Sequence, residues 1–256
     1  MKHLFSETGL QVLESLSFTR TLYAFDFDGT LAPIVAKPEL AKASSETEDL
    51  LNQLASRVSV GVISGRSVKD LQTRIQLNGN LLIGNHGLEG LHVKKEAKEK
   101  AELVCREWAH QLNRSWGSLK KDPGLFVEDK TYSLALHYRR SRNKKLARPQ
   151  LFSLIEKLSP SPRVILGKSV MNLLPSGGPH KGVALLEAMI KLDLKCGFYI
   201  GDDDTDEDVF SLPDDRIMTV RVGLKKSSQA QFYLKRQSEM NKLLRILVDV
   251  NRTKAN

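Results

Sequence analysis

Short apolar runs alternate with amphipathic segments over residues 21–85, and this alternation constrains the fold more than any other feature of the chain. Runs of apolar and β-branched side chains predict three strands, at residues 21–27, 58–63 and 81–85. Helices are predicted between them, the first capped by Ser44 or Ser45 and the second at residues 68–75. The order β-α-β-α-β is typical of a parallel sheet covered by helices.

A different pattern follows, because the next predicted elements have the order α-β-β-α-β-β of a small α+β unit. They are two helices at residues 94–116 and 148–158, and four strands at residues 124–127, 132–138, 163–166 and 170–174. The sequence PSGGP at residues 175–179 indicates a hinge. Alternation then resumes with a helix at residues 181–191, strands at 196–201 and 217–222, and a helix at 241–251. We therefore predict an α/β fold, a doubly wound, Rossmann-like parallel sheet formed by residues 1–90 and 177–256, with an α+β cap inserted at residues 91–176.

Polar residues stand where the predicted parallel strands end, which is where open α/β sheets bind their ligands. Asp26, Ser64 and Asp202 each end a strand, and Lys181 follows the hinge. In the sequence DFDGT at residues 26–30, the first and third side chains face the same way, and Gly29 permits a sharp turn beside an anion. Such a pair suits phosphate chemistry, with one carboxylate attacking phosphorus while the other carries a proton. The alternative is a strand end with two solvated acids.

The acidic run GDDDTDED at residues 201–208 follows an apolar strand, which favours a metal site over a solvated loop. Mg²⁺ prefers hard oxygen ligands such as these carboxylates. Calcium-loop spacing is excluded, since Glu207 and Pro213 occupy its required glycine and glutamate positions. Ser64 lacks the preceding glycine of a hydrolase serine elbow, and a phosphate-binding loop at residues 167–169 fails at Pro162. A hydroxyl at Ser64 and the positive charge of Lys181 are therefore expected to contact a phosphoryl group.

Together these four elements resemble the haloacid dehalogenase superfamily of phosphatases. The resemblance covers DFDGT at residues 26–30, Ser64, Lys181 and GDDDTD at residues 201–206. It implies that Asp26 is the nucleophile, that Asp28 is the general acid and then the base, and that Ser64 and Lys181 hold the phosphoryl group. It also implies a Mg²⁺ ion held by Asp26, Asp28 through its backbone carbonyl, and Asp202, with Asp206 in support.

A narrower resemblance is to the trehalose-6-phosphate phosphatases, carried by SGR at residues 64–66, GNHGLE at 84–89, EDK at 128–130, HYR at 137–139 and NLLP at 172–175. This resemblance implies Mg²⁺-dependent hydrolysis of trehalose 6-phosphate through an aspartyl-phosphate. The substrate-binding residues that it implies are Gly29, Gly65, Arg66, Asn85, His86 and Glu89 on the core, and Glu128, Lys130 and Asn172 on the cap. One departure is Asn172 with Leu174, where related enzymes often carry glutamate and lysine. The alternative is therefore a related phosphatase acting on another phosphorylated saccharide, such as sucrose 6-phosphate or a glucosyl-glycerate-type ester.

The charge and composition of the chain limit the classes of partner that it can bind. A formal charge of +9 fits a nucleic-acid partner, an anionic substrate or a solvated basic surface, and the basic cluster at residues 139–145 lies on the predicted cap. Nucleic-acid binding is disfavoured because no zinc finger or aromatic RNA-binding signature occurs. Neither a membrane span nor a secretory leader is evident, and Cys105 and Cys196 read as two isolated, buried thiols. We expect a cytoplasmic, monomeric enzyme with a phosphorylated disaccharide as its partner.

Overall fold

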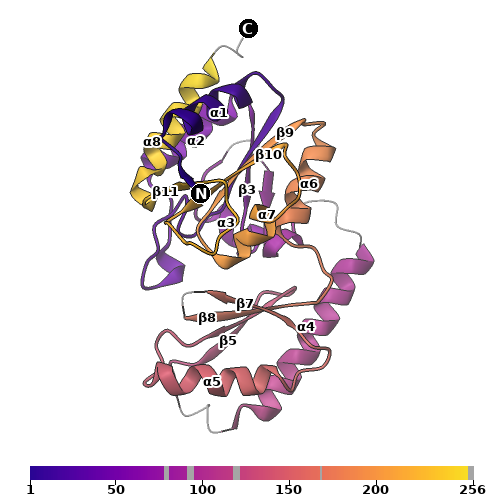
Figure 1. Ribbon diagram of the computed structural model, residues 1–256. Coiled ribbons are helices and arrows are strands. Elements are labelled where there is room, and N and C mark those ends of the chain that lie inside the picture. Colours follow the sequence, from indigo (N-terminus) through magenta and orange to yellow (C-terminus); the bar gives the residue numbers. More distant parts are fainter. Residues whose placement is uncertain (78–80, 91–94, 118–121, 168, 253–256) are drawn as a thin grey trace. The chain divides into compact units, whose positions relative to one another are not determined.

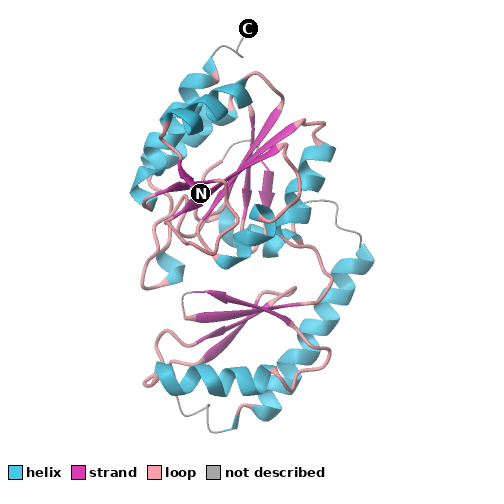
Figure 2. Cartoon of the chain, viewed as in Figure 1, coloured by secondary structure: helices cyan, strands magenta, loops and turns pink. Residues whose placement is uncertain are grey.

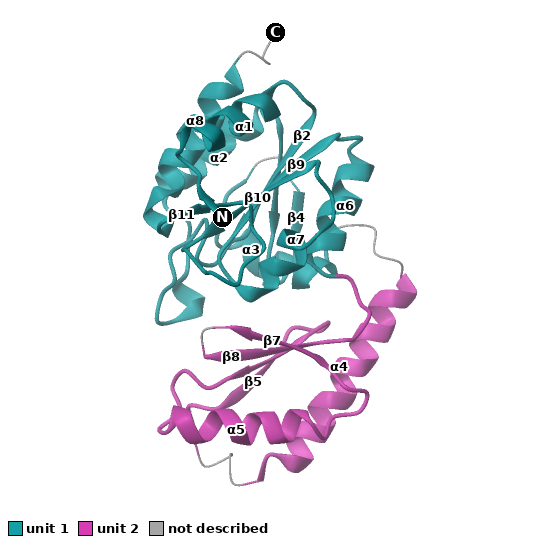
Figure 3. Ribbon diagram, in the orientation of Figure 1, with its two compact units in different colours: residues 1–91, 180–256 teal, residues 92–179 magenta. Residues whose placement is uncertain are grey.

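The chain forms two compact units that alternate along the sequence. The computed structural model describes residues 1–77, 81–90, 95–117, 122–167 and 169–252 (Figure 1). Residues 1–91 and 180–256 form the first unit, and residues 92–179 form the second (Figure 3). The sequence indicated boundaries at 90/91 and 176/177, within the same two connecting segments.

A parallel sheet forms the centre of the first unit (Figure 2). Its strand order is β1-β11-β10-β9-β2-β3-β4. Its strands in the described residues are β1 (Lys2–His3), β2 (Thr21–Phe25), β3 (Ser59–Ile63), β4 (Leu81–Ile83), β9 (Cys196–Gly201), β10 (Ile217–Val222) and β11 (Phe232–Leu234). All neighbouring pairs run parallel, and β9 pairs with β2 on one side and β10 on the other. Strands from the two halves of the first unit therefore meet at the centre of one sheet.

Helices cover both faces of this sheet, which confirms the predicted doubly wound α/β class. They are α1 (Glu7–Ser17), α2 (Ser45–Ala55), α3 (Val68–Gln72), α6 (Lys181–Lys191), α7 (Glu207–Phe210) and α8 (Met240–Val250). Serine side chains begin three of them: the hydroxyls of Ser6, Ser44 and Ser67 accept hydrogen bonds from backbone N–H groups of the first turn. Such caps satisfy donors that a helix start leaves without partners inside the helix.

Alternation of side chains along the strands divides the core between the two faces. On β2, Tyr23 and Phe25 pack with helices α1, α2 and α8, whereas Leu22 and Ala24 pack with α6 and α7. This is the two-residue period of a strand that is covered on both sides. Because both faces are buried, the strand ends are the part of the sheet that is left for chemistry.

The second unit is an α+β layer of its own, as predicted. Its antiparallel sheet has the order β5-β6-β8-β7, with strands β5 (Phe126–Asp129), β6 (Leu134–His137), β7 (Arg163–Gly167) and β8 (Val170–Leu174). Helices α4 (Lys95–Ser115) and α5 (Lys144–Ile155) cover it, and its core includes Trp108, Leu136, Leu151 and Met171. Both helices pack on the face of the sheet that carries Leu136 and Met171.

Several expectations differ from the structure. Strands β1 and β11 were not predicted, because two or three paired residues are too few to show a period. Helix α1 was not predicted either, because Glu7 and Glu14 interrupt the apolar pattern of this segment. Strand β2 ends at Phe25, so Asp26 lies just beyond it. Helix α5 begins at Lys144 because the side chain of Asn143 caps it. The expectation of two buried thiols is wrong for Cys196, which is partly exposed at the start of β9.

Among the described residues, none of the helices combines the length and the apolar character that crossing a bilayer requires.

Replacement of Phe198 is expected to destabilise the first unit strongly. The ring lies on the central strand β9 with its centroid 5.9 Å from that of Tyr23 and 6.0 Å from that of Phe25. Phe198→Ala leaves a cavity in a close-packed layer, and urea unfolding should show a loss of about 3–5 kcal/mol. Phe18→Ala is the matched control because that ring is 79% exposed, and an equal loss in both variants would contradict the packing described here.

Candidate active site

Three carboxylates lie together at the carboxyl ends of β2 and β9. Oxygens of Asp26, Asp202 and Asp206 lie within 4.8 Å of one another. Asp26 follows β2, and its backbone N–H donates to the carbonyl of Ile200 at 2.8 Å, which ties it to the neighbouring strand. The predicted convergence of strand ends on one rim is therefore present, and these hard oxygen donors could hold a divalent metal ion.

Lys181, the first residue of α6, is buried between two of these carboxylates. Its Nζ donates to Oδ1 of Asp26 at 2.8 Å and to Oδ1 of Asp206 at 2.7 Å, and the side chain is 2% exposed. A buried ammonium is tolerated when it is paired and hydrogen-bonded in this way. Lys181 thus joins residues that are far apart in sequence into one site.

The electrostatics of this group favour an additional positive charge. Burial raises the pKa of the Asp26 carboxyl well above its usual range, an effect that Lys181 opposes and that Asp206 and Asp202 reinforce. Burial alone would lower the pKa of the Lys181 ammonium, but Asp206 and Asp26 outweigh it and raise that pKa. Three acidic side chains and one ammonium leave an excess of negative charge, which a cation at the carboxylates would offset.

Two residues that sequence reasoning missed hold the acidic loop in place. The Tyr199 hydroxyl donates to Oδ1 of Asp206 at 2.6 Å, and burial first, with Asp206 next, raises the pKa of this phenol. Arg221 donates to the carbonyls of Asp202 and Asp203 at 2.6 and 3.1 Å. The signal for Arg221 was present in the sequence, since a lone charge inside the apolar strand β10 requires a partner.

Gly29 packs directly against the acidic loop. Its φ is +80°, and a Cβ atom built on it would lie 2.2 Å from Oδ2 of Asp202. Its N–H donates to the carbonyl of Ala32 at 2.8 Å, which closes a tight turn. Glycine is required here both for the left-handed backbone and for the space that the Asp202 carboxylate fills. The turn after Asp26 and the acidic run are therefore shaped to each other.

Ser64 and Arg66 follow β3 on the same rim. The Ser64 side chain is buried, and its hydroxyl accepts a hydrogen bond from the Arg66 N–H at 3.2 Å. Arg66 donates to Asp28 through Nε at 2.6 Å and Nη2 at 2.7 Å. The structure therefore brings Asp28 and Arg66 together, a pairing that the sequence did not predict.

Residues after β4 form a buried, strained corner beside this rim. Asn85 and His86 have φ values of 47° and 56°, a left-handed conformation that non-glycine residues seldom adopt. Asn85 donates to Oε1 of Glu89 at 2.7 Å, and Oε2 of Glu89 accepts from the backbone of Val68 at 2.6 Å. A Cβ atom on Gly65 would lie 2.6 Å from the His86 ring, so glycine is needed for their close approach. The contacts of these residues support the rim, and their expected role in sugar binding stays a prediction.

The second unit carries its predicted residues on one face of its sheet. Glu128 pairs in register with Ala135, which pairs with Asn172, so the two polar side chains lie on the same face. Nε2 of His137 lies 2.8 Å from Oε2 of Glu128, and Nζ of Lys130 lies 3.9 Å from that oxygen. This face therefore presents a group of hydrogen-bonding side chains.

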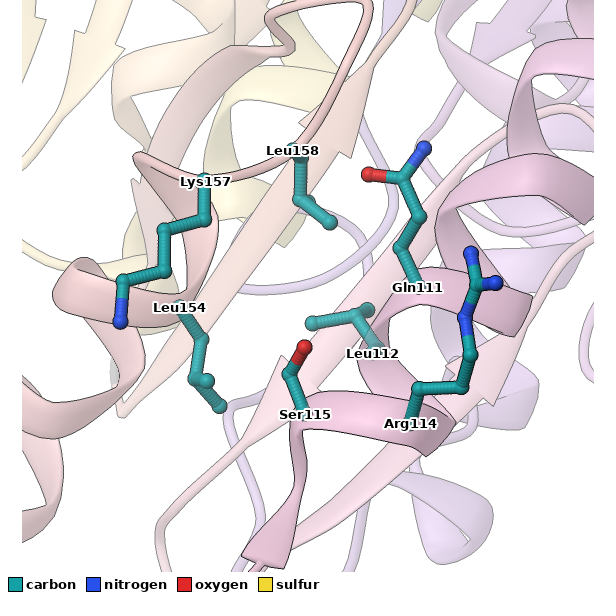
Figure 4. Close-up of a pocket in the computed structure, with 7 residues that line it drawn as sticks. All are labelled: Gln111, Leu112, Arg114, Ser115, Leu154, Lys157 and Leu158. Atoms are coloured by element: carbon teal, nitrogen blue, oxygen red, sulfur yellow. The ribbon is translucent and has the colours of Figure 1, made fainter.

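A surface pocket of the second unit is separate from all of these residues. It lies between the end of α4 and the end of α5, and side chains of Leu112, Leu154, Leu158 and Gln111 line it (Figure 4). It contains no residue that the sequence assigned to the site.

Comparisons with known proteins identify the family of this chain. A family model described as trehalose-phosphatase matches residues 24–238. A trehalose-phosphate phosphatase of Mycobacterium ulcerans is 33% identical over 207 residues, which cover 77% of this chain and 52% of that protein. The chain thus spans about half the length of the curated relatives it matches.

Solved structures show the same fold. One is titled as a trehalose-6-phosphate phosphatase related protein, with a TM-score of 0.73, 24% identity and coverage of 91% of this chain and 99% of that one. Another is the C-terminal domain of trehalose-6-phosphate phosphatase from C. albicans, with a TM-score of 0.71, 23% identity and coverage of 94% and 96%. At this identity the likeness concerns the fold alone, and the predicted α/β core with an inserted α+β unit is confirmed.

Loss of the Lys181 charge is expected to destabilise the metal-free protein in a pH-dependent way. Lys181→Met leaves Asp26 and Asp206 buried without their cation, which should cost about 3–5 kcal/mol at neutral pH. A raised folded-state pKa of Asp26 means that its stability contribution is present at low pH and is lost as the pH rises through that pKa. Without Lys181 this pKa rises further, so the deficit should shrink on acidification.

Urea unfolding in EDTA at several pH values measures this effect. The control is Lys195→Met, which removes a lysine that is 68% exposed and pairs with Asp193 at 3.2 Å, and which should change stability by less than about 1 kcal/mol. A deficit in Lys181→Met that is independent of pH would rule out the proposed electrostatic cause.

Proposed function

The chain belongs to the trehalose-phosphatase family, and from this we propose that it is a Mg²⁺-dependent phosphatase that hydrolyses trehalose 6-phosphate to trehalose and phosphate. The observation that carries the proposal is the buried ammonium of Lys181 between Asp26 and Asp206, with Asp202 beside them. An acid that follows a buried strand is common, but one held by a buried lysine and two further carboxylates is typical of a reaction centre.

We propose that Asp26 and Asp202, with the backbone carbonyl of Asp28, hold the metal ion. Asp206 is the supporting member, because both of its oxygens already accept hydrogen bonds from Lys181, Tyr199 and the Asp203 N–H. When bound, Mg²⁺ supplies charge neutralisation between the Asp26 carboxylate and the dianionic phosphate. The carboxylate donor set fits this hard cation.

In the proposed reaction Asp26 attacks phosphorus and forms an aspartyl-phosphate while the bond from phosphorus to the sugar oxygen breaks. Lys181 fixes one oxygen of Asp26 and keeps the side chain in one orientation, and positioning of this kind supplies much of the rate enhancement. Asp28 gives its proton to the departing sugar oxygen and then takes one from the water that hydrolyses the intermediate. Ser64 and Lys181 supply donors to the phosphoryl oxygens.

The sugar contacts are proposed for the face of the second unit that carries Glu128, Lys130 and Asn172. Carboxylate, ammonium and amide groups on one sheet face suit a ligand with many hydroxyls. Nε2 of His137 lies 2.8 Å from Oε2 of Glu128 and fixes the direction of that carboxylate. The neutral amide of Asn172 makes a weaker contact than a charged glutamate. The alternative substrate is therefore another phosphorylated saccharide, such as sucrose 6-phosphate.

Removal of the nucleophile is expected to abolish turnover. Asp26→Asn should reduce phosphate release from trehalose 6-phosphate to the background, because an amide cannot attack phosphorus. The same variant should remain folded, as checked by circular dichroism and thermal unfolding, since asparagine keeps the shape and still accepts from Lys181. Full activity of Asp26→Asn would end the aspartyl-phosphate mechanism.

The substrate is tested by turnover of phosphorylated disaccharides and monosaccharides with and without Mg²⁺. Glu128→Gln should lower kcat/KM for the best disaccharide about 10- to 100-fold, because a charge-assisted hydrogen bond is replaced by a neutral one. Its effect on a phosphorylated monosaccharide that cannot reach Glu128 should be small. Equal losses on all esters would argue against a sugar-binding role for this face.

A further inference from the structure

A chain of four alternating charges runs away from the proposed general acid. Arg66 donates to both oxygens of Asp28, through Nε at 2.6 Å and Nη2 at 2.7 Å, and through Nη1 to Oδ2 of Asp70 at 2.7 Å. Asp70 in turn accepts from Arg74, at 2.8 Å from Nε and 2.7 Å from Nη2. Asp28 is therefore connected to α3 and the residues after it by charge-assisted hydrogen bonds.

The far end of this chain is anchored in backbone. Nη1 of Arg74 donates to the carbonyls of Glu39 and Ala41 at 2.7 and 3.1 Å, and Nη2 of Arg66 donates to the carbonyl of Pro38 at 2.8 Å. These carbonyls belong to the segment that follows the Asp28 turn. The four side chains thus hold both the general acid and the loop beyond it in one frame.

The spacing of the frame follows from helix geometry. Arg66, Asp70 and Arg74 are four residues apart: Asp70 lies in α3, Arg66 just before its N-cap and Arg74 just after its C-cap, so both arginines reach the Asp70 carboxylate from the two ends of this short helix. The Ser67 hydroxyl caps this helix by accepting from the backbone N–H of Asp70, while the Asp70 carboxylate accepts from the two arginines.

The charges of Asp70 and Arg66 are stabilised by the partners of these side chains. Burial tends to raise the pKa of the Asp70 carboxyl, but Arg74 and Arg66 outweigh it and hold that pKa below its usual value. Burial likewise opposes the charge of Arg66, and Asp28 and Asp70 restore it by raising the pKa of the guanidinium. A guanidinium that is itself held by Asp70 stays in one plane, so the Asp28 oxygen that accepts from it is held in one direction.

We propose that Asp70 is a positioning residue for catalysis: it holds the Arg66 fork, which in turn orients the Asp28 carboxyl toward the leaving oxygen. The inference rests on the proposed function. As the bond from phosphorus to the sugar oxygen breaks and the bond to Asp26 forms, the proton on one oxygen of Asp28 moves to the sugar oxygen. Arg66 keeps its hydrogen bond to the other oxygen of Asp28 in that state, so the proton-bearing oxygen stays directed. Asp70 itself touches no reacting atom.

The leaving group separates this role from a merely structural one. A sugar alkoxide is a poor leaving group and needs the proton of Asp28, whereas p-nitrophenolate is a stable anion and leaves without one. Loss of orientation at Asp28 should therefore slow the formation of the aspartyl-phosphate from the sugar ester and spare its formation from p-nitrophenyl phosphate. The later hydrolysis of the aspartyl-phosphate is common to both esters, so the comparison is made on kcat/KM, which reports the steps up to the departure of the leaving group. Damage to the fold, the metal site or Asp26 would slow both.

The experiment measures kcat and KM of Asp70→Ala and Asp70→Asn with saturating Mg²⁺ on the best sugar phosphate and on p-nitrophenyl phosphate. Asp70→Ala should lower kcat/KM on the sugar ester by at least about 10-fold and leave kcat/KM on p-nitrophenyl phosphate within about twofold of the wild type. Asp70→Asn, which keeps one acceptor for Arg66, should lie between.

The matched control is Asp214→Asn. Asp214 also accepts from an arginine through two oxygens, at 2.9 and 2.6 Å from Arg216, but it stands before β10, at the opposite end of the strands from the site. It should leave both rates unchanged.

Equal losses of kcat/KM on the two esters in Asp70→Ala would overturn the positioning role while leaving the phosphatase itself intact. A wild-type protein that hydrolyses neither ester would instead overturn the proposed function and the inference with it. Thermal unfolding confirms that each variant is folded. Should Asp70→Ala fail to fold, the same comparison of esters in Asp70→Asn decides the question.

Discussion

A buried ammonium ion determines how the first unit is assembled. Lys181 has no access to water, so its charge requires carboxylates at hydrogen-bonding distance, and Asp26 and Asp206 provide them. This requirement fixes the start of α6 beside the ends of β2 and β9. It also holds two carboxylates close together that would otherwise repel each other. The arrangement of the rim is therefore determined first by the electrostatics of this buried ammonium.

Around this centre, neutral and charged side chains donate hydrogen bonds to the carboxylates and the acidic loop and hold them in place. Tyr199 holds Asp206 from within the sheet, Arg221 holds the backbone of the acidic loop, and Arg66 holds Asp28 from the side of α3. Each of these three side chains is largely buried, so water competes little for the hydrogen bonds that it donates. A site supported in this way is rigid without help from the ligand, which lowers the cost of arranging it during reaction.

Much of this organisation was predictable from sequence because it is local. The β-α alternation is visible in the apolar runs, and the positions of Asp26, Ser64, Lys181 and Asp202 follow from where those runs end. The pairing of Arg66 with Asp28 was not predictable, since it depends on the direction of two side chains after different strands. Short elements such as β1 and β11 also escaped, because they exist through pairing with neighbours and carry no pattern of their own.

The position of β9 has a consequence for how the protein is made. This strand lies between β2 and β10, yet the ribosome completes it after the whole of the second unit has emerged. Until then one edge of β2 has no partner strand, and Asp26 lacks the lysine that lies 155 residues further along the chain. Such long-range closure is slow and leaves strand edges exposed to other chains. During synthesis the second unit is complete before β9 emerges, whereas the first unit must wait for the last third of the polypeptide.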